Sequence, residues 1–394
     1  YEPHSGAHVQ THSFDDAFWP LDYANTNQSG MELLLLKGDT AFLWETGLND
    51  TYPNSELNFQ LDTGISGGVM ADYNNDGNME ILAVKNLPAE RVIQAYKRNA
   101  NGVLVAQNIL SNTTPTNQRN NFVPTIIVDN LDGDNYKDIL CADTDGDVMV
   151  YEITTPAQQF LRWSTRLPVA NTYSLTTGDY DGNGTKDFFV GGYSTSVLNP
   201  DLNFWHFEGF TRAANDNYTS MGSLMINTVQ SQNSIHSADL DADGKDEVIL
   251  ATAPNLYILK YQNGAFKPVF HGDSQRNYQV STWTDENGQI RILANAEIAP
   301  DSTAAVQWTL QQPFTGPETP ANLQVRPLDE HKIKISWASS GAPQYRLYRK
   351  DSEGSVSYYD LDNVIAYVDS ALITGSSYSY AIAARNPSFS PVES

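Results

Sequence analysis

Residues 239–247 read Asp-Leu-Asp-Ala-Asp-Gly-Lys-Asp-Glu, and three other stretches have nearly the same spacing of acidic residues and glycine. They are 72–80 (Asp-Tyr-Asn-Asn-Asp-Gly-Asn-Met-Glu), 130–138 (Asn-Leu-Asp-Gly-Asp-Asn-Tyr-Lys-Asp) and 179–187 (Asp-Tyr-Asp-Gly-Asn-Gly-Thr-Lys-Asp). The four copies begin 58, 49 and 60 residues apart. A motif that returns every 40–60 residues or so is typical of repeat architectures, propellers among them. The fold is therefore expected to consist of repeated structural units.

Strand-like segments lie on both sides of each copy. A short apolar run follows every one, at residues 81–84, 139–142, 188–190 and 248–251. Turn signals such as Asn101-Gly102 and Asn263-Gly264 come next, and these dipeptides favour two-residue hairpins. The repeat is therefore predicted to be an antiparallel sheet of about four strands, which is the form of a β-propeller blade in an all-β protein.

Two weaker copies flank the four intact ones and determine the predicted number of blades. Residues 21–36 and 283–294 keep the apolar run but have lost most of the acidic positions. Counting both predicts a propeller of about six blades over residues 1–312, with seven as the alternative. The last blade is short of one strand. Residues 5–14 could supply that strand and close the ring, which would remove an exposed edge.

The intact loops present oxygen atoms at regular positions. Side chains at positions 1, 3, 5 and 9 and the backbone carbonyl at position 7 would converge on one point. Gly77, Gly184, Gly244 and Asn135 at position 6 tolerate a positive φ. All-oxygen, carboxylate-rich sets suit Ca²⁺, whereas Zn²⁺ prefers His and Cys. The predicted ligands of about four structural Ca²⁺ ions are Asp72, Asn74, Asp76, Asn78, Glu80, Asn130, Asp132, Asp134, Tyr136, Asp138, Asp179, Asp181, Asn183, Thr185, Asp187, Asp239, Asp241, Asp243, Lys245 and Glu247.

Two other interpretations compete with a calcium site. An EF-hand loop needs an acidic residue at position 12, where these loops have Ala83, Cys141, Val190 and Leu250. Solvated turns rich in Asp, Asn and Gly would explain one copy but not four copies with matching positions. Carboxylates held this close repel one another, and a divalent cation removes that cost. Calcium is therefore the favoured interpretation.

The loops resemble FG-GAP or VCBS repeats, the calcium-binding blades of integrin α-subunit-like propellers. The resemblance covers about residues 15–310, although Asn74, Asn130 and Asn183 stand where the family has aspartate. It implies ions that brace the blades and take no part in catalysis, while partners bind on loops elsewhere.

The sequence changes character after residue 312. Residues 313–319 belong to a Pro-rich linker, and residues 320–394 contain alternating strand-like segments. Trp337 is expected in the core of this part, and the spacing of Leu372, Gly375 and Tyr378 is that of a tyrosine corner. Residues 320–394 resemble a fibronectin type III domain, a small β-sandwich that usually acts as a spacer or docking module.

The composition of the chain restricts the kinds of partner and location that can be expected. The 394 residues carry a net charge of −24, so phosphate backbones and anionic lipid surfaces are repelled, and nucleic acid is not expected as a partner. No stretch reaches the ~18–20 consecutive apolar residues needed to cross a bilayer. The single cysteine, Cys141, excludes internal disulfides and argues against a disulfide-stapled animal ectodomain. A secreted or cell-surface location on a bacterium is expected.

Two further motifs are candidates for a ligand or catalytic site. Phe204, Trp205 and Phe207 follow a long stretch and would stack on sugar rings if they were exposed; burial is the competing interpretation. Residues 64–68 match the G-x-S-x-G pattern, but that motif needs a following helix, which the sequence does not predict. No catalytic residue is therefore assigned.

The favoured function is a non-enzymatic extracellular calcium-binding propeller that acts in adhesion or binds glycans or proteins at the cell surface. Two alternatives stay open. One is a polysaccharide-degrading enzyme of the lyase type, or its accessory subunit; the other is an architectural subunit of a larger surface complex. The sequence makes no prediction about the oligomeric state.

Overall fold

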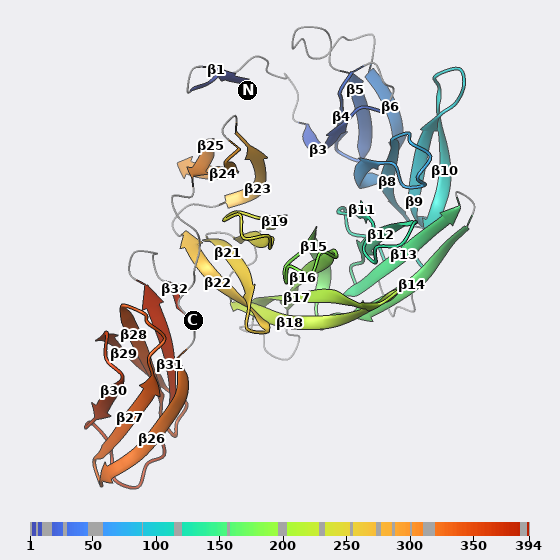
Figure 1. Cartoon of the computed structure of the whole chain (residues 1–394). Coiled ribbons are helices and arrows are strands. Elements are labelled where there is room, and N and C mark those ends of the chain that lie inside the picture. The colour runs from blue at the N-terminus through green and yellow to red at the C-terminus, as the bar shows by residue number, and fades with distance from the viewer. Residues whose placement is uncertain are drawn as a thin grey trace. The chain divides into compact units, whose positions relative to one another are not determined.

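A computed structural model of the chain shows an all-β protein (Figure 1). The structure describes residues 2–4, 7–9, 18–26, 30–45, 58–88, 90–113, 120–155, 158–195, 203–227, 233–252, 255–272, 277–285, 288–299, 302–309, 320–386 and 392–393. Within these ranges the regular elements are strands, and none is a helix. The predicted linker at 313–319 lies outside the described residues.

In the described residues, five antiparallel sheets of four strands follow one another, and in each the strands neighbour one another in chain order. The first two sheets are β3 (Trp19–Ala24), β4 (Glu32–Lys37), β5 (Thr40–Glu45), β6 (Asn58–Thr63) and β7 (Ile65–Ala71), β8 (Glu80–Leu87), β9 (Glu90–Arg98), β10 (Leu104–Ser111). The third and fourth are β11 (Ile127–Asp129), β12 (Lys137–Ala142), β13 (Asp147–Thr155), β14 (Gln158–Arg166) and β15 (Ala170–Gly178), β16 (Asp187–Thr195), β17 (Asn203–Ala214), β18 (Asn217–Asn227). The fifth is β19 (Asn233–Ala238), β20 (Glu247–Thr252), β21 (Asn255–Gln262), β22 (Ala265–Gly272).

The next sheet has three strands among the described residues: β23 (Asn277–Thr284), β24 (Ile290–Ala299) and β25 (Ser302–Thr309). Residues 5–14 were predicted to supply a fourth strand to this sheet. Of these, residues 7–9 form β2 (Ala7–Val9), which pairs with β1 (Glu2–His4) in a separate two-stranded sheet. That pairing corrects the prediction for residues 7–9, because a short hairpin satisfies their backbone groups locally. The remainder of 5–14 lies outside the described residues.

Apolar side chains of the second and third strands form the cores between consecutive sheets. Leu82 and Ile93 pack with Ile139 and Met149, all fully buried. The predicted apolar runs after the acidic stretches are confirmed as buried second strands, because both faces of each such sheet are covered. Each acidic stretch is thus the connection between the first and second strands of a sheet.

Two sheets make up the carboxyl-terminal part (Figure 1). One is β26 (Ala321–Asp329), β27 (Lys332–Ala338) and β30 (Ala366–Asp369); the other is β28 (Gln344–Lys350), β29 (Val356–Asp362), β31 (Ser379–Asn386) and β32 (Val392–Glu393). Trp337 and Tyr345 are buried in their shared core, as predicted for Trp337. The Tyr378 hydroxyl accepts a hydrogen bond from the Ile373 amide at 3.1 Å, which is the contact expected from the tyrosine-corner spacing.

The described chain divides into two compact units. One unit contains residues up to 177 together with 184–230, and the other contains 178–183 together with residues from 231 onward. The second unit therefore combines the sheets from β19 to β25 with the carboxyl-terminal sheets.

Candidate cation-binding loops

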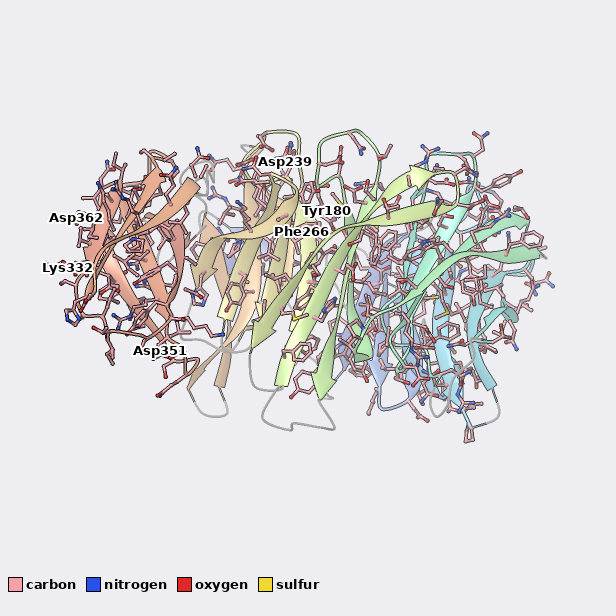
Figure 2. All side chains as sticks on the ribbon, turned by 90° about the horizontal axis from the view of Figure 1, so that it is seen from below. Tyr180, Asp239, Phe266, Lys332, Asp351 and Asp362 are labelled. Carbon is pink, nitrogen blue, oxygen red and sulfur yellow. The ribbon has the colours of Figure 1, made fainter. Side chains whose placement is uncertain are left out.

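Four loops connect the first and second strands of successive sheets: the first loop (72–80), the second (130–138), the third (179–187) and the fourth (239–247). In the first, third and fourth loops a carboxylate at position 1 accepts hydrogen bonds from the backbone of its own loop. Asp239 accepts hydrogen bonds from the amides of Asp243 and Gly244 at 3.1 and 3.0 Å, and Asp72 accepts the equivalent pair. Figure 2 labels Asp239 in this loop. These turns, in which an Asp side chain binds amides further along, explain why the motif folds locally.

Positive φ angles occur at two positions in three of the loops. At position 6, Gly77, Gly184 and Gly244 have φ of 82–85°, as predicted. Position 4 also has positive φ in all four loops, and the sequence reasoning missed it because the residues there are Asn75, Gly133, Gly182 and Ala242. In the second loop the positive φ falls at Gly133, whereas Asn135 is not among the residues with positive φ.

The position-9 carboxylates are buried at the starts of the second strands or one residue inside them. Glu80, Asp138, Asp187 and Glu247 are each at most 2% exposed. The backbone amides of Leu131 and Leu240 each donate to the position-9 carboxylate of their own loop at 2.8 Å. In two loops the carboxylates come together. Asp179, Asp181 and Asp187, and likewise Asp239, Asp241 and Glu247, present oxygens within 4.8 Å of one another.

Some of the other predicted ligands lie at the rims of the loops, whereas Asp132 is 1% exposed. Asp76, Asn78, Asn183 and Asp243 are exposed, and Tyr136 at position 7 of the second loop is 43% exposed. The position-5 carboxylates of Asp76, Asp134 and Asp243 each accept the amide of position 7 at 2.6–3.1 Å. This bond orients position 7, the residue whose carbonyl was predicted as a ligand.

Neighbouring loops are linked by hydrogen bonds that the sequence did not reveal. The Asp246 carboxylate, at position 8 of the fourth loop, accepts the Asp179 amide at 2.8 Å, and the Asp246 amide donates to the Asp179 carbonyl at 2.8 Å. In the first unit, the Asn75 side chain donates to the Asn135 carbonyl at 2.9 Å. A loop that changes its conformation would therefore disturb the next one.

The closing carboxylate of the second loop is difficult to ionise. Burial, assisted by repulsion from Asp132, Asp134 and Glu152, raises the pKa of Asp138 to about 8. Glu152 lies opposite Asp138 in the β12–β13 ladder. Arg162 donates to Glu152 at 2.9 Å and lies 3.5 Å from Asp216. A cation bound to this loop would keep Asp138 ionised.

Lysine side chains enter the fourth and first loops. Lys260 of β21 places its Nζ 2.6 Å from Asp241, 2.8 Å from Asp243 and 2.8 Å from Glu247, with a side chain only 5% exposed. Lys97 of β9 binds Asp76 and lies 3.2 Å from Glu80. These lysines were absent from the predicted set, because they belong to third strands and not to the motif.

The aromatic patch predicted as a ligand site is corrected by the structure. Trp205 is 3% exposed and Phe207 is fully buried, while Phe204 is half-buried. The rings of Trp205 and Phe207 stack with centroids 5.9 Å apart, and Phe207 stacks on Phe189. The rings of Trp205 and Phe207 are buried in the fold, so a glycan could not stack on either of them. The segment 64–68 is also structural, since residues 65–71 form β7 and no helix follows in the described residues.

His236 yields a prediction about acid stability. It lies half-buried in β19, and its Nε2 is 2.8 Å from the Thr282 hydroxyl. Burial lowers its pKa, and the nearby Asp246 only partly opposes this. The unfolded chain, with a histidine pKa of about 6.5, therefore takes up the proton more readily, and stability is lost as pH falls through and below that value.

We expect His236→Gln to reduce the fall in melting temperature between pH 7.5 and pH 5.5, as measured by thermal unfolding across that range. His331→Gln, at an exposed histidine of the carboxyl-terminal sheets, controls for the general effect of losing a histidine. A His236→Gln profile parallel to that of the parent protein would contradict the prediction.

Comparison with known proteins supports the repeat. A model of the FG-GAP-like repeat matches residues 130–190, which contain the second and third loops. Together with the series of four-stranded sheets, this match fits a β-propeller. A search of curated proteins found no match. The described part of the chain contains no helix with the length and hydropathy that a membrane crossing needs.

Two solved structures align with the chain at low similarity. The crystal structure of BBS1N in complex with ARL6DN, soaked with lead, aligns with a TM-score of 0.49 at 7% identity, over 83% of this chain and 91% of that one. A lectin from Agrocybe aegerita, described as recognising non-reducing terminal N-acetylglucosamine, aligns with a TM-score of 0.44 at 11% identity, over 93% and 85%.

Proposed function

We propose that the protein is a non-enzymatic, calcium-braced β-propeller of about six blades that binds a glycan or protein partner at the cell surface. The observation that carries this proposal is the recurrence of one acidic loop between the first and second strands of four sheets, with its closing carboxylate buried each time. A buried carboxylate needs a cationic or hydrogen-bonding partner. Recurrence at the same structural position indicates a bracing role, because catalysis would need a single site.

The donor chemistry favours Ca²⁺. The side chains at the ligand positions of the third loop, from Asp179 to Asp187, offer only oxygen donors apart from the amide nitrogen of Asn183. Ca²⁺ takes six to eight oxygens at about 2.3–2.6 Å and accepts irregular geometry. In the second loop, Asp132, Asp134 and Asp138 would hold the ion, and its charge would offset the repulsion that raises the pKa of Asp138.

The proposed affinity of the loops for Ca²⁺ favours an extracellular location. Calcium-binding modules outside cells commonly have dissociation constants of about 10⁻⁴–10⁻³ M, which suit a calcium-rich exterior. The single Cys141 is buried and free of disulfides, so bracing by ions would replace bracing by disulfides. We assign residues 320–394 to a fibronectin type III-like module, on the two-sheet arrangement and the Tyr378 contact.

Chelation tests the calcium. We expect the melting temperature in 10 mM Ca²⁺ to exceed that in EGTA by several degrees, since one site with a dissociation constant of about 0.1–1 mM contributes about 1.4–2.7 kcal/mol at that concentration. Equal Mg²⁺ controls for ionic strength, because Mg²⁺ demands an octahedral geometry. Asp181→Ala should remove part of the difference. Identical melting curves in Ca²⁺, Mg²⁺ and EGTA would refute calcium bracing.

Partner binding is tested separately from calcium. A glycan array that retains the protein without releasing product would support a binding function. New reducing ends or unsaturated sugars in the same samples would instead indicate a polysaccharide-degrading enzyme.

A further inference from the structure

The four loops fall into two classes that differ at two positions at once. In the first and fourth loops the position-9 residue is glutamate, Glu80 and Glu247; in the second and third it is aspartate, Asp138 and Asp187. The residue across the ladder on the third strand changes with it. That residue is Lys97 or Lys260 opposite the two glutamates, and Glu152 or Thr211 opposite the two aspartates.

The register that produces this contrast is the same in all four sheets. Ile81 pairs with Tyr96 and Val248 pairs with Leu259, which puts the next residue outward, a lysine, opposite the glutamate. The same step brings Glu152 opposite Asp138 and, by continuing the Phe188–Phe210 pairing, Thr211 opposite Asp187. Each lysine therefore comes from an equivalent place in its sheet.

The Lys260 ammonium contacts three of the carboxylates predicted as metal ligands of the fourth loop. It is within 2.6–2.8 Å of one oxygen from each of Asp241, Asp243 and Glu247, which stand at positions 3, 5 and 9. Its side chain is 5% exposed, and those of Asp241 and Glu247 are at most 4% exposed. The ammonium donates a hydrogen bond to Asp241 at 2.6 Å and lies within ion-pair distance of Asp243 and Glu247. A Ca²⁺ ion bound to the same oxygens would need the same volume and would repel the ammonium.

Lys97 makes the equivalent contacts in a more open setting. It binds Asp76 at position 5 and Glu80 at position 9, and its side chain is 47% exposed. Position 3 of the first loop is Asn74, which carries no charge, so the first loop needs less cationic charge than the fourth. The second loop differs, because Arg162 forms ion pairs with Glu152 and Asp216, which lie outside the motif.

We infer that Lys97 and Lys260 are the resident cations of the first and fourth loops, and that divalent metal binding is confined to the second and third loops. Two sheets are then stabilised by a lysine ammonium at every calcium concentration, and the stability of the other two depends on the bound metal. The metal half of this inference rests on the proposed function, whereas the lysine half does not. It revises the expected number of ions from about four to two.

The test is a count of bound Ca²⁺ by isothermal titration and by equilibrium dialysis with the full chain. We expect about two ions per parent chain and about four for Lys97→Thr/Lys260→Thr. Threonine is chosen because Thr211 occupies this position in the β15–β18 sheet. Lys350→Thr, at an exposed lysine of β28, is the matched control and should leave the count at two.

The number of ions gained by the double variant tests whether the two lysines exclude a metal. The number of ions bound by the parent chain tests whether the second and third loops bind Ca²⁺. A parent chain that binds three or four ions would overturn the inference, as would a double variant with no gain. A parent count of zero with a gain of two would support the resident lysines but refute calcium in the second and third loops. Zero ions in both proteins would refute metal binding by all four loops, and with it the inference that the two lysines exclude a metal. Lys97→Thr alone, at the more exposed lysine, keeps the test decisive if the double variant does not fold, since it should gain one ion.

Discussion

Replacing Arg98 with methionine is expected to lower the free energy of unfolding by about 3–5 kcal/mol, the usual cost of removing one partner from a buried ion pair. The Arg98 guanidinium lies 2.5 Å from a carboxylate oxygen of Glu32, whose side chain is 0% exposed. The Thr26 amide donates to the other oxygen at 2.9 Å. Glu32 begins the second strand of the β3–β6 sheet, so it occupies the place of the position-9 carboxylates in the sheet whose loop has lost the motif. The Arg98 guanidinium pairs with this buried carboxylate, as Lys97 and Lys260 pair with the position-9 glutamates of the first and fourth loops.

Urea-induced unfolding, followed by circular dichroism, would measure this effect. Arg98→Met/Glu32→Gln should recover much of the loss, because the double variant removes the buried charge together with its partner. Arg346→Met is the matched control. Its partner Asp360 is 48% exposed, so its ion pair should contribute at most about 1 kcal/mol. An Arg98→Met protein as stable as the control would show that solvent already compensates the Glu32 charge.

Gly67→Ala is expected to destabilise the β7–β10 sheet by about 2–4 kcal/mol through overpacking. A Cβ atom at Gly67 would lie 2.0 Å from the Pro124 carbonyl oxygen and 2.6 Å from the Pro124 Cα. These are backbone atoms and cannot rotate away, so the first strand would have to move. Gly67 does not need glycine for its φ angle, since it is not among the residues with positive φ. Its requirement comes from this close approach.

Gly38→Ala separates the clash from the general effect of adding a methyl group. Gly38 has φ of 64°, and a Cβ atom at this position would have no neighbouring atom within 4 Å. Its variant should therefore lose only about 1–2 kcal/mol from backbone strain. Thermal unfolding of both variants gives the comparison. If Gly67→Ala melts at or above the temperature of Gly38→Ala, the close approach is not a constraint on the fold.

Much of the fold followed from local patterns. The acidic stretch, the apolar run after it and the dipeptide turns all act within about ten residues. The structure confirms the acidic stretch as a loop, the apolar run as a buried second strand and Asn263-Gly264 as a two-residue hairpin turn. The prediction of a two-residue turn at Asn101-Gly102 is wrong, because residues 99–103 connect β9 and β10. The Asp72 and Asp239 side chains bind amides of their own loops, so the loop conformation is encoded by adjacent residues. Trp205 shows the limit of this reasoning, because exposure depends on what covers a strand and not on how aromatic it is.

Local sequence patterns were enough to predict the repeated four-stranded unit and the carboxylate-rich loop that follows the first strand of each intact copy. The partners of those carboxylates depend on tertiary contacts: Lys260 and Lys97 reach them from third strands, and Arg98 reaches Glu32 from the next sheet. A turn is stabilised by bonds between near neighbours, whereas the cation opposite a buried carboxylate depends on strand register and on how one sheet packs against the next.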